Sequence, residues 1–264
     1  PPRSTLFPYT TLFRSELLYS LESKGKLVYP NTKTTWSFDD KLGQKYQLEA
    51  MKLPLVPTFV FFSKQEALEW ISKTEWPIVF KLRSGAGGRN VRLLKNKREA
   101  RRVINKAFGK GIRPYNAIGG IKESVRRYRL GKATIKEIIK SILHVWYPVL
   151  LENSKGREKG YVYFQKFIPD CKSDVRVKLV GERIWAKIRN VRKNDFRASH
   201  SGDSLFDPNL ISKKALLLSL EISRKLKLQS VAIDLLPYNG DFLIAEISYA
   251  FGWDPKEFEA GYWD

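Results

Sequence analysis

The sequence contains one cysteine, two histidines and one methionine among 264 residues. A single cysteine, Cys171, excludes an intrachain disulfide and a cysteine zinc site, and His144 and His200 alone give little basis for a histidine-rich metal centre. No apolar run is long enough to cross a bilayer, and no signal peptide is visible. We therefore expect a protein without a transmembrane segment in a reducing, cytoplasmic setting.

Acidic residues are also scarce, which leaves a net charge of +21. The excess is regional, because residues 92–160 carry 19 lysines and arginines against 5 acids, a net charge of +14. Nucleotides, acidic glycans, anionic membranes and nucleic acid are all candidate partners for such a surface. The hydrophobic fraction of 43% is enough for one core or for two lobes that share a cleft.

The opening segment PPRSTLFPYTTLFRS resembles translated sequencing-adapter read-through. We expect residues 1–15 to be an artefact and disordered, with a natural disordered leader as the alternative. We further expect a fragment, in which residues 16–53 are the remnant of an N-terminal domain and a linker helix.

Residue patterns predict alternating helices and strands. Capping signals at Ser63 and Asn96 each precede a glutamate by three residues, which is typical of a helix start. Predicted helices are residues 38–51, 65–73, 97–108, 133–146 and 212–226, and predicted strands are residues 58–62, 77–83, 90–94, 161–168, 174–180, 183–190, 230–236 and 241–249. This order indicates an α+β protein with antiparallel sheets: a first lobe over residues 54–164, with a basic insertion at about 107–145, and a second lobe over residues 165–264.

The segment KLRSGAGGRNV joins two predicted strands through a glycine-rich turn. Glycines allow backbone amides to approach phosphate oxygens closely, and Lys81 on the entering strand could hold a phosphate as a point charge. The turn lacks the Gly-Lys-Ser/Thr ending of a Walker A loop, and a strand rather than a helix follows it. Taken alone, the pattern favours a glycine-rich hairpin with a solvated lysine.

Two acids occupy the last predicted strand pair, with Asn239-Gly240 between the strands. A two-residue turn there places Asp234 and Glu246 on opposite faces, whereas a three-residue turn at 238–240 places them on one face, with Asp234 opposite Ile244. Both acids have apolar neighbours, so each needs a metal ion or a basic partner. Metal binding and arginine pairing are equally compatible with these residues.

The order of these features resembles the ATP-grasp superfamily, and within it the ligases similar to glutathione synthetase and the glutamate-adding enzymes. The resemblance covers residues 38–249 and rests on Asp39-Asp40-Lys41, the glycine-rich turn, QKFI, DVR, DFRAS and the two final acids. It implies two α+β lobes that grip ATP between antiparallel sheets. The C-terminal tail is similar to that of uncharacterised ATP-grasp proteins of bacterial polysaccharide loci.

The resemblance also implies residue roles. Phosphate contacts would come from Lys41, Lys81 and the loop of residues 84–90, including Ser84, Gly85, Gly87 and Gly88. The adenine would be lined by Gln165, Lys166, Phe167 and Ile168, and the ribose hydroxyls would be bound by Asp174. Arg176, Lys187 and Arg189 would face the phosphates or the acyl group, with Arg189 and Arg197 as catalytic residues. Ser199 would border the nucleotide, and one or two Mg²⁺ would be held by Asp234, Glu246 and Ser248.

Three residues depart from the family pattern. Lys166 stands where the family has an acid, which leaves a backbone contact there, and Ser199 and Ser248 stand where it has asparagine. The serine side chain is shorter than that of asparagine and offers magnesium a weaker oxygen ligand. Whether one or two metal ions bind is therefore left open.

The resemblance implies a ligase that joins a small-molecule or glycan carboxylate to an amine, or a thiol, through an acyl phosphate, in polysaccharide or cell-envelope biosynthesis. One alternative is an ATP-binding fragment without activity. Another is a basic protein that binds nucleic acid or an anionic surface, although no nucleic-acid motif is present. The helix predicted at 133–146 is amphipathic, and a solvated basic face competes with surface binding there.

Overall fold

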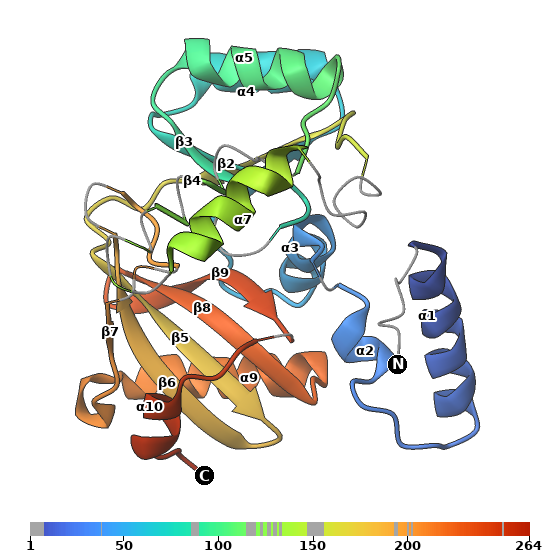
Figure 1. Ribbon diagram of the computed structural model, residues 1–264, viewed down its shortest axis with the longest axis vertical. Coiled ribbons are helices and arrows are strands. Elements are labelled where there is room, and N and C mark those ends of the chain that lie inside the picture. Colours follow the sequence, from blue (N-terminus) through green and yellow to red (C-terminus); the bar gives the residue numbers. More distant parts are fainter. Residues whose placement is uncertain are drawn as a thin grey trace.

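The computed structural model describes residues 8–37, 39–85, 90–114, 120–121, 124–125, 128, 131, 134–146, 156–192, 195–199, 201, 203–249 and 251–264. These residues form two sheets, with helices on the outer side of each (Figure 1). Every strand pairing in both sheets is antiparallel, so the predicted α+β class is confirmed.

The first sheet has four strands in the order β1-β4-β2-β3. Its strands are β1 (Thr58–Phe61), β2 (Ile78–Lys81), β3 (Val91–Leu94) and β4 (Val162–Lys166). Ile78, Phe80 and Phe164 point to one face and form a core with helices α4 (Lys64–Lys73) and α5 (Lys97–Phe108). Alternation along the strands therefore turns Val79 and Lys81 to the opposite face.

The second sheet has five strands in the order β7-β6-β5-β8-β9. They are β5 (Ser173–Val180), β6 (Arg183–Asn190), β7 (Ser204–Leu205), β8 (Ser230–Tyr238) and β9 (Asp241–Ser248). Helix α9 (Lys213–Leu226) covers one face through a core that includes Val177, Ile233 and Ile244. The charged residues of β5, β6 and β8 occupy the other face, because they alternate with the core residues.

The β8–β9 hairpin differs from both geometries considered for it. Tyr238 pairs with Asp241 across a two-residue turn, in which Asn239 and Gly240 both have positive φ. This register continues to Leu235 and Ile244, and then a bulge shifts it so that Asp234 pairs with Glu246. The expected three-residue turn is therefore wrong, yet the two acids share a face because Ala245 is the extra residue of the bulge.

Two helices begin where their capping residues predict, and a third, predicted from residue 38, begins at Lys41. Ser63 accepts a hydrogen bond from Glu66 N, and Asn96 accepts one from Glu99 N. Helix α3 (Lys41–Ala50) begins after Asp40, whose carboxylate accepts from Leu42 N and Gly43 N. Each cap satisfies backbone donors that the first turn leaves without an intrahelical partner.

The segment after α3 connects the two sheets. Pro54 O accepts from Ile244 N at 2.7 Å, and Val56 N donates to Ile244 O at 3.0 Å. These bonds place residues 54–56 along β9, and β1 of the first sheet starts two residues later. Strand β4 extends to Lys166, so the first sheet ends two residues beyond the expected lobe boundary.

The terminal segments add short elements that the sequence patterns did not predict. Helix α1 (Pro8–Ser23) includes residues 8–15, so the expected disorder does not hold there; proline at its first position is compatible with a helix start. Helix α2 (Thr32–Thr35) follows, and Asn31 N donates to Gln229 Oε1. A short helix α10 (Pro255–Glu259) begins after Asp254, whose carboxylate accepts from Lys256 N.

The predicted insertion at 107–145 falls partly outside the described residues. Within it, helix α7 (Ile135–Trp146) confirms the amphipathic helix predicted at 133–146. The base of the insertion is closed by Ile112 and Glu158, which pair through two backbone hydrogen bonds. Across the described part of the chain, no helix is both long and apolar enough to span a membrane.

Truncating the core of the second sheet should destabilise the protein. We expect Ile233→Ala to lower the free energy of unfolding by about 2–5 kcal/mol, because Ile233 is fully buried and the neighbouring residues cannot fill the cavity. Leu217→Ala on the solvent side of α9 is the matched control, with an expected change within about 0.5 kcal/mol. Urea denaturation measures both, and equal effects would contradict this account of the core.

Candidate functional site

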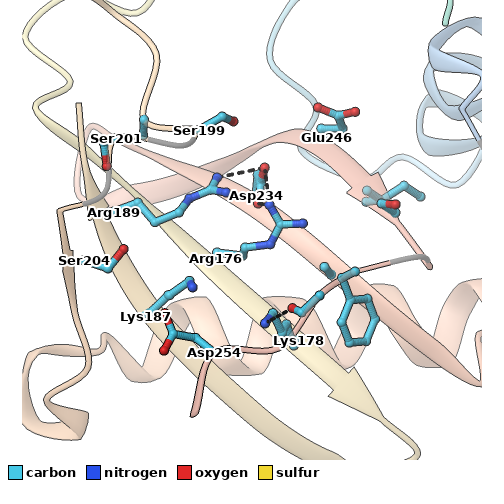
Figure 2. Close-up of a pocket in the computed structure, with 16 residues that line it drawn as sticks. Arg176, Lys178, Lys187, Arg189, Ser199, Ser201, Ser204, Asp234, Glu246 and Asp254 are labelled. Carbon is cyan, nitrogen blue, oxygen red and sulfur yellow. Dashed lines mark hydrogen bonds and ion pairs between the residues drawn. The ribbon is translucent and has the colours of Figure 1, made fainter. Parts of the chain in front are cut away.

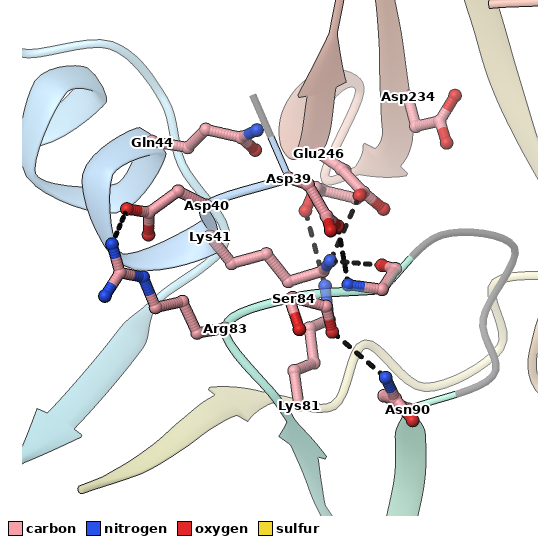
Figure 3. Close-up of polar contacts among 12 residues, drawn as sticks. Asp39, Asp40, Lys41, Gln44, Lys81, Arg83, Ser84, Asn90, Asp234 and Glu246 are labelled. Atoms are coloured by element: carbon pink, nitrogen blue, oxygen red, sulfur yellow. Dashed lines mark hydrogen bonds and ion pairs between the residues drawn. The ribbon is translucent and has the colours of Figure 1, made fainter. Parts of the chain in front are cut away.

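Two lysines approach the acids from the first sheet and from α3 (Figure 3). Lys81 at the end of β2 is only 7% exposed, and its Nζ donates to Ala245 O at 3.3 Å. Burial lowers the Lys81 pKa to about 8, although Glu246 opposes the shift. Lys41 Nζ donates to Gly85 O at 2.7 Å and lies 3.3 Å from Glu246 Oε1. The two predicted phosphate-binding lysines therefore lie beside a predicted metal ligand.

The root of the glycine-rich loop is held by side chains on both sides. Gly85 N donates to Asp39 Oδ1 at 2.5 Å, and Asn90 Nδ2 donates to Ser84 O at 3.0 Å. Gly85 has φ +114°, and a Cβ there would lie 2.3 Å from Asn90 Nδ2, so only glycine fits. The predicted site residues Gly87 and Gly88 lie outside the described residues.

The paired acids face the interior from the centre and edge of the second sheet. Asp234 on β8 and Glu246 on β9 are directly opposite, and Ser248 lies two residues beyond Glu246 on the same face. Directly opposite residues of an antiparallel pair have Cβ atoms about 4.5–5.5 Å apart. The Cβ atoms of the two acids are therefore closer together than in the diagonal arrangement considered from the sequence.

Arginines of β5 and β6 converge on Asp234. Arg189 Nη2 lies 2.8 Å from Asp234 Oδ2 and 2.5 Å from Asp174 Oδ2, and Arg176 Nη1 lies 3.3 Å from Asp234 Oδ1. Burial disfavours the Asp234 carboxylate, but the two arginines more than offset it and lower its pKa. Burial also opposes the charge on Arg189, yet Asp234 and Asp174 raise the Arg189 pKa. Asp234 and Arg189 are therefore ionised at neutral pH, whereas burial raises the Asp174 pKa to about 6 although Arg189 opposes the shift.

The predicted magnesium ligands fit an ion that is shared with a nucleotide. Among the described residues, no three acid, histidine or cysteine side chains form a metal cluster of their own. Mg²⁺ commonly takes only one or two carboxylates and completes its shell with phosphate oxygens and water. Asp234 Oδ1 is buried and accepts no hydrogen bond from the described residues, although Arg176 lies nearby. The arginine pairing considered from the sequence is thus present, and one oxygen of Asp234 still accepts no hydrogen bond from the described residues.

A cavity of about 340 Å³ lies between the inner faces of the two sheets. The connection after β4 forms one wall, where Phe167 and Phe196 meet edge to face at 6.1 Å between ring centroids. Gln165 is buried and donates to Thr58 Oγ1, whereas the Lys166 side chain is exposed. The cavity is lined by predicted nucleotide residues from both lobes: Lys81, Gln165, Lys166, Phe167, Ile168, Asp174, Arg197, Ser199, Asp234 and Glu246.

The DFRAS segment forms a tight turn beside this cavity. Arg197 Nε and Nη2 donate to Asp195 Oδ2 at 2.9 and 2.6 Å; burial opposes the Asp195 charge, but Arg197 lowers the Asp195 pKa. Arg192 Nε donates to Ser199 O at 2.7 Å. Arg197 is therefore held by its own turn, and its predicted catalytic role stays a prediction.

A second cavity of about 390 Å³ continues along the charged face of the second sheet (Figure 2). Four cations line it, namely Arg176, Lys178, Lys187 and Arg189, together with the hydroxyls of Ser199, Ser201, Ser204 and Ser248. Asp234, Glu246 and Ser199 line both cavities. The predicted metal ligands therefore stand where the two cavities meet.

Comparison with known proteins accounts for this arrangement. Residues 134–259 match the RimK-like ATP-grasp domain. A RimK domain ATP-grasp protein from Sphaerobacter thermophilus DSM 20745 has a TM-score of 0.50 at 17% identity, over 89% of this chain and 67% of that chain. The chain therefore has the ATP-grasp fold.

Two further ATP-grasp structures show the same fold. The ligase PsnB, complexed with a minimal precursor, has a TM-score of 0.56 at 15% identity, over 94% of this chain and 63% of that chain. The D-alanine–D-alanine ligase of Bacillus anthracis has a TM-score of 0.52 at 15% identity, over 92% of this chain and 69% of that chain. The chain thus spans about two thirds of the length of these proteins. No curated protein matches its sequence.

Other charged residues of this site were not predicted from the sequence. Glu257 on α10 is 3% exposed and bridges Lys178 to Lys187, with Lys187 Nζ 2.5 Å from its Oε1. Lys178 Nζ also donates to Gly252 O at 2.6 Å and lies 4.6 Å from the centre of the Trp253 ring. The Asp254-Pro255 pair is a helix-start signal that could have identified α10, but no sequence signal places Glu257 between two lysines of the sheet.

Lys81 should make ATP binding depend on pH. Above its pKa of about 8, Lys81 is mostly neutral in the free protein, and nearby phosphate charge favours its ammonium form. Binding should therefore take up a proton at alkaline pH, and ATP affinity should fall there by up to about tenfold per pH unit. Isothermal titration calorimetry in buffers with different ionisation enthalpies measures both quantities.

The Lys81→Met variant is the control for this pH dependence. Methionine has a similar length but no titratable group. We therefore expect this variant to bind ATP more weakly, with an affinity that no longer falls at alkaline pH and without proton uptake on binding. An unchanged decline in this variant would assign the pH dependence to another group.

Removing the charge of Glu257 should destabilise the C-terminal segment. Burial lowers the Lys178 pKa and Glu257 opposes that shift, so Glu257→Gln leaves a buried ammonium without its anion. We expect the free energy of unfolding to fall by about 3–5 kcal/mol in urea denaturation. Glu259→Gln, on the exposed side of the same helix, should stay within about 0.5 kcal/mol, and equal effects would contradict the role of the buried pairs.

Proposed function

We propose that the chain is an ATP-dependent ligase, which binds Mg-ATP between its two sheets and phosphorylates a carboxylate held in the cationic cavity. This proposal rests on one observation. Asp234, Glu246 and Ser199 line both cavities, so they form a wall that the two cavities share. A nucleotide in the first cavity would present its γ-phosphate at that wall. An anionic substrate in the second cavity would approach the same phosphate from the opposite side.

The reaction would proceed in two substitutions. A carboxylate oxygen of the substrate attacks the γ-phosphorus, the bond to the β–γ bridging oxygen breaks, and ADP leaves. An amine nitrogen then attacks the acyl carbon, the bond to the phosphate oxygen breaks, and the amine gives up a proton as phosphate leaves. Each step needs aligned reactants and stabilised charge rather than a covalent nucleophile on the protein.

The described side chains supply both requirements. Lys41 and Lys81 lie on the first-lobe side of the acids, and Arg189 and Arg176 lie on the second-lobe side, so cations surround the expected phosphate position. Ion pairs hold Lys41, Arg176 and Arg189 before ligand binds, and a hydrogen bond to Ala245 O holds Lys81, which reduces reorganisation during the reaction. Magnesium held by Asp234, Glu246 and Ser248 would neutralise charge on the β- and γ-phosphates.

The second cavity supports an anionic substrate with hydroxyl groups. Its cations suit a carboxylate, and its serines suit further hydrogen bonds. The amine partner, a role in polysaccharide or cell-envelope biosynthesis, and a cytoplasmic setting stay predictions.

Thermal unfolding with and without Mg-ATP tests nucleotide binding. At a concentration about 100 times its Kd, a ligand stabilises by about 2.7 kcal/mol, which corresponds to roughly 5–10 °C for a chain of this size. We expect this shift in the unaltered protein and its loss in Lys81→Ala and Asp234→Asn, because these changes remove a phosphate cation and a metal ligand. Lys214→Ala, which removes an exposed ion pair with Asp241, should keep the full shift.

The outcomes separate binding from activity. A shift without release of ADP in the presence of candidate carboxylates would indicate a nucleotide-binding fragment that lacks part of the enzyme. The absence of any shift with Mg-ATP, or an identical shift in both site variants, would overturn the proposed function.

A further inference from the structure

Helix α7 turns apolar side chains to solvent. They recur at helical spacing within an arc of about 100°, and we refer to them as the apolar face of α7. The four residues are Ile135, Ile139, Ile142 and Leu143, with exposed fractions of 60%, 52%, 43% and 52%. None of them belongs to a hydrophobic core of the described part of the chain. This face therefore has no partner within either lobe.

Helix α5 shows how an amphipathic helix of this protein packs when its partner is the protein itself. It is as long as α7, but its apolar side turns to the first sheet, where Val103 and Ile104 are buried. Figure 1 shows α5 beside α4, and α7 apart from that pair. On α5 only the basic side faces solvent, whereas α7 exposes charged and apolar side chains alike. A solvated basic face alone, the alternative considered from the sequence, does not describe α7.

The charges of α7 are arranged around its apolar face. Lys136 and Lys140 follow one edge of the face, and both are exposed. Their long side chains can lie along the apolar residues and bring their ammonium groups to the same surface. Glu137 lies nearly opposite the centre of the face, where its carboxylate accepts from Thr134 N at 3.3 Å. The acid is thus turned away, so apolar and cationic groups would meet one partner together.

This combination selects among the possible partners. An anionic lipid surface offers both an apolar phase and negative charge. Nucleic acid offers phosphate charge but little for branched aliphatic side chains to bury against. A second copy of the chain would bring two like-charged segments together, because residues 122–140 carry seven lysines and arginines against two acids, a net charge of +5. The lipid surface therefore fits α7 best.

The length of α7 determines how it would meet such a surface. With 12 residues it is about 18 Å long, well short of the roughly 30 Å of a hydrocarbon core. A short amphipathic helix with lysines beside its apolar side chains lies in the plane of the interface. The apolar residues then reach the acyl chains while the lysines stay among the headgroups.

We propose that α7 docks the protein on an anionic lipid surface. Its apolar face contacts the acyl boundary, and Lys136 and Lys140 contact the negative headgroups. No described residue of α7 lines either cavity, so this binding site is separate from the one proposed for the nucleotide and the carboxylate. It adds a place of action to the proposed ligase and does not depend on that reaction.

Co-sedimentation with lipid vesicles tests the apolar face. We expect the full chain to bind anionic vesicles, made of phosphatidylcholine and phosphatidylglycerol, at least about tenfold more tightly than vesicles of phosphatidylcholine alone. Ile139→Asp places a charge at the centre of the apolar face and should weaken binding to the anionic vesicles by about tenfold or more. Leu217→Asp changes the net charge equally at an exposed position of α9, and it should stay within about twofold because remote charges are screened.

A second pair of variants tests the lysines. Lys136→Gln combined with Lys140→Gln should weaken binding to anionic vesicles by about fivefold for each charge removed, and leave binding to neutral vesicles unchanged. Lys213→Gln combined with Lys214→Gln removes the same charge from α9 and is the matched control. All four lysines are exposed, so we expect both double variants to fold.

The outcomes separate lipid from the other partners. Absence of binding to anionic vesicles, equal binding to both kinds of vesicle, or equal affinities of Ile139→Asp and Leu217→Asp would overturn the inference. A dimer in analytical ultracentrifugation that Ile139→Asp dissociates, without vesicle binding, would assign the apolar face to a second copy. Binding to duplex DNA without vesicle binding would assign the basic segment to nucleic acid. If Ile139→Asp does not fold, the lysine pair decides, and an affinity for anionic vesicles equal to that of its control overturns the inference.

Discussion

The β-bulge at Ala245 is the constraint on which the site depends. In a regular strand, residues 244 and 246 point to the same face, so a buried Ile244 would take Glu246 into the core with it. The extra residue changes the alternation, which lets Ile244 pack under α9 while Glu246 faces Asp234. The same residue accepts the hydrogen bond of Lys81 through its carbonyl oxygen. One inserted residue therefore brings together an acid pair and a lysine from the other lobe.

Strand register then determines how the charges on this face balance. Four charged residues form a row across the sheet, in which each residue lies directly opposite the next. They are Lys187 on β6, Arg176 on β5, Asp234 on β8 and Glu246 on β9. Lys187 and Arg176 are like charges in opposite positions, which is unfavourable by itself. Asp234 binds Arg176 from one side, and Glu257 of the C-terminal segment binds Lys187 from the other. The C-terminal segment therefore contributes to the charge balance of the sheet.

Local patterns in the sequence predicted most of the fold, because caps and alternation act over a few residues. Ser63, Asn96 and the alternating strands β4, β5, β6, β8 and β9 lie where their patterns indicate, whereas the two-residue strand β7 was not predicted. The family resemblance, rather than these patterns, assigned Lys81, Asp174, Arg189 and Asp234 to one site, and the four residues line the two adjoining cavities. The local patterns could not predict the bulge, because an Asn-Gly turn fixes the register only near the turn. They also missed Glu257, whose partners lie far along the chain and follow no motif.

The ion pairs of the free protein bear on how a ligand would be bound. Lys41 already pairs with Glu246, and Arg189 already pairs with Asp234 and Asp174, so these charges are compensated before a ligand binds. A magnesium nucleotide would exchange these pairs for contacts of the same kind: phosphates for the cations and magnesium for the acids. Such an exchange adds less affinity than filling an uncompensated site would, because each new contact replaces an existing one. It also keeps the side chains oriented before binding, and oriented charge is the condition for stabilising a transferring phosphate.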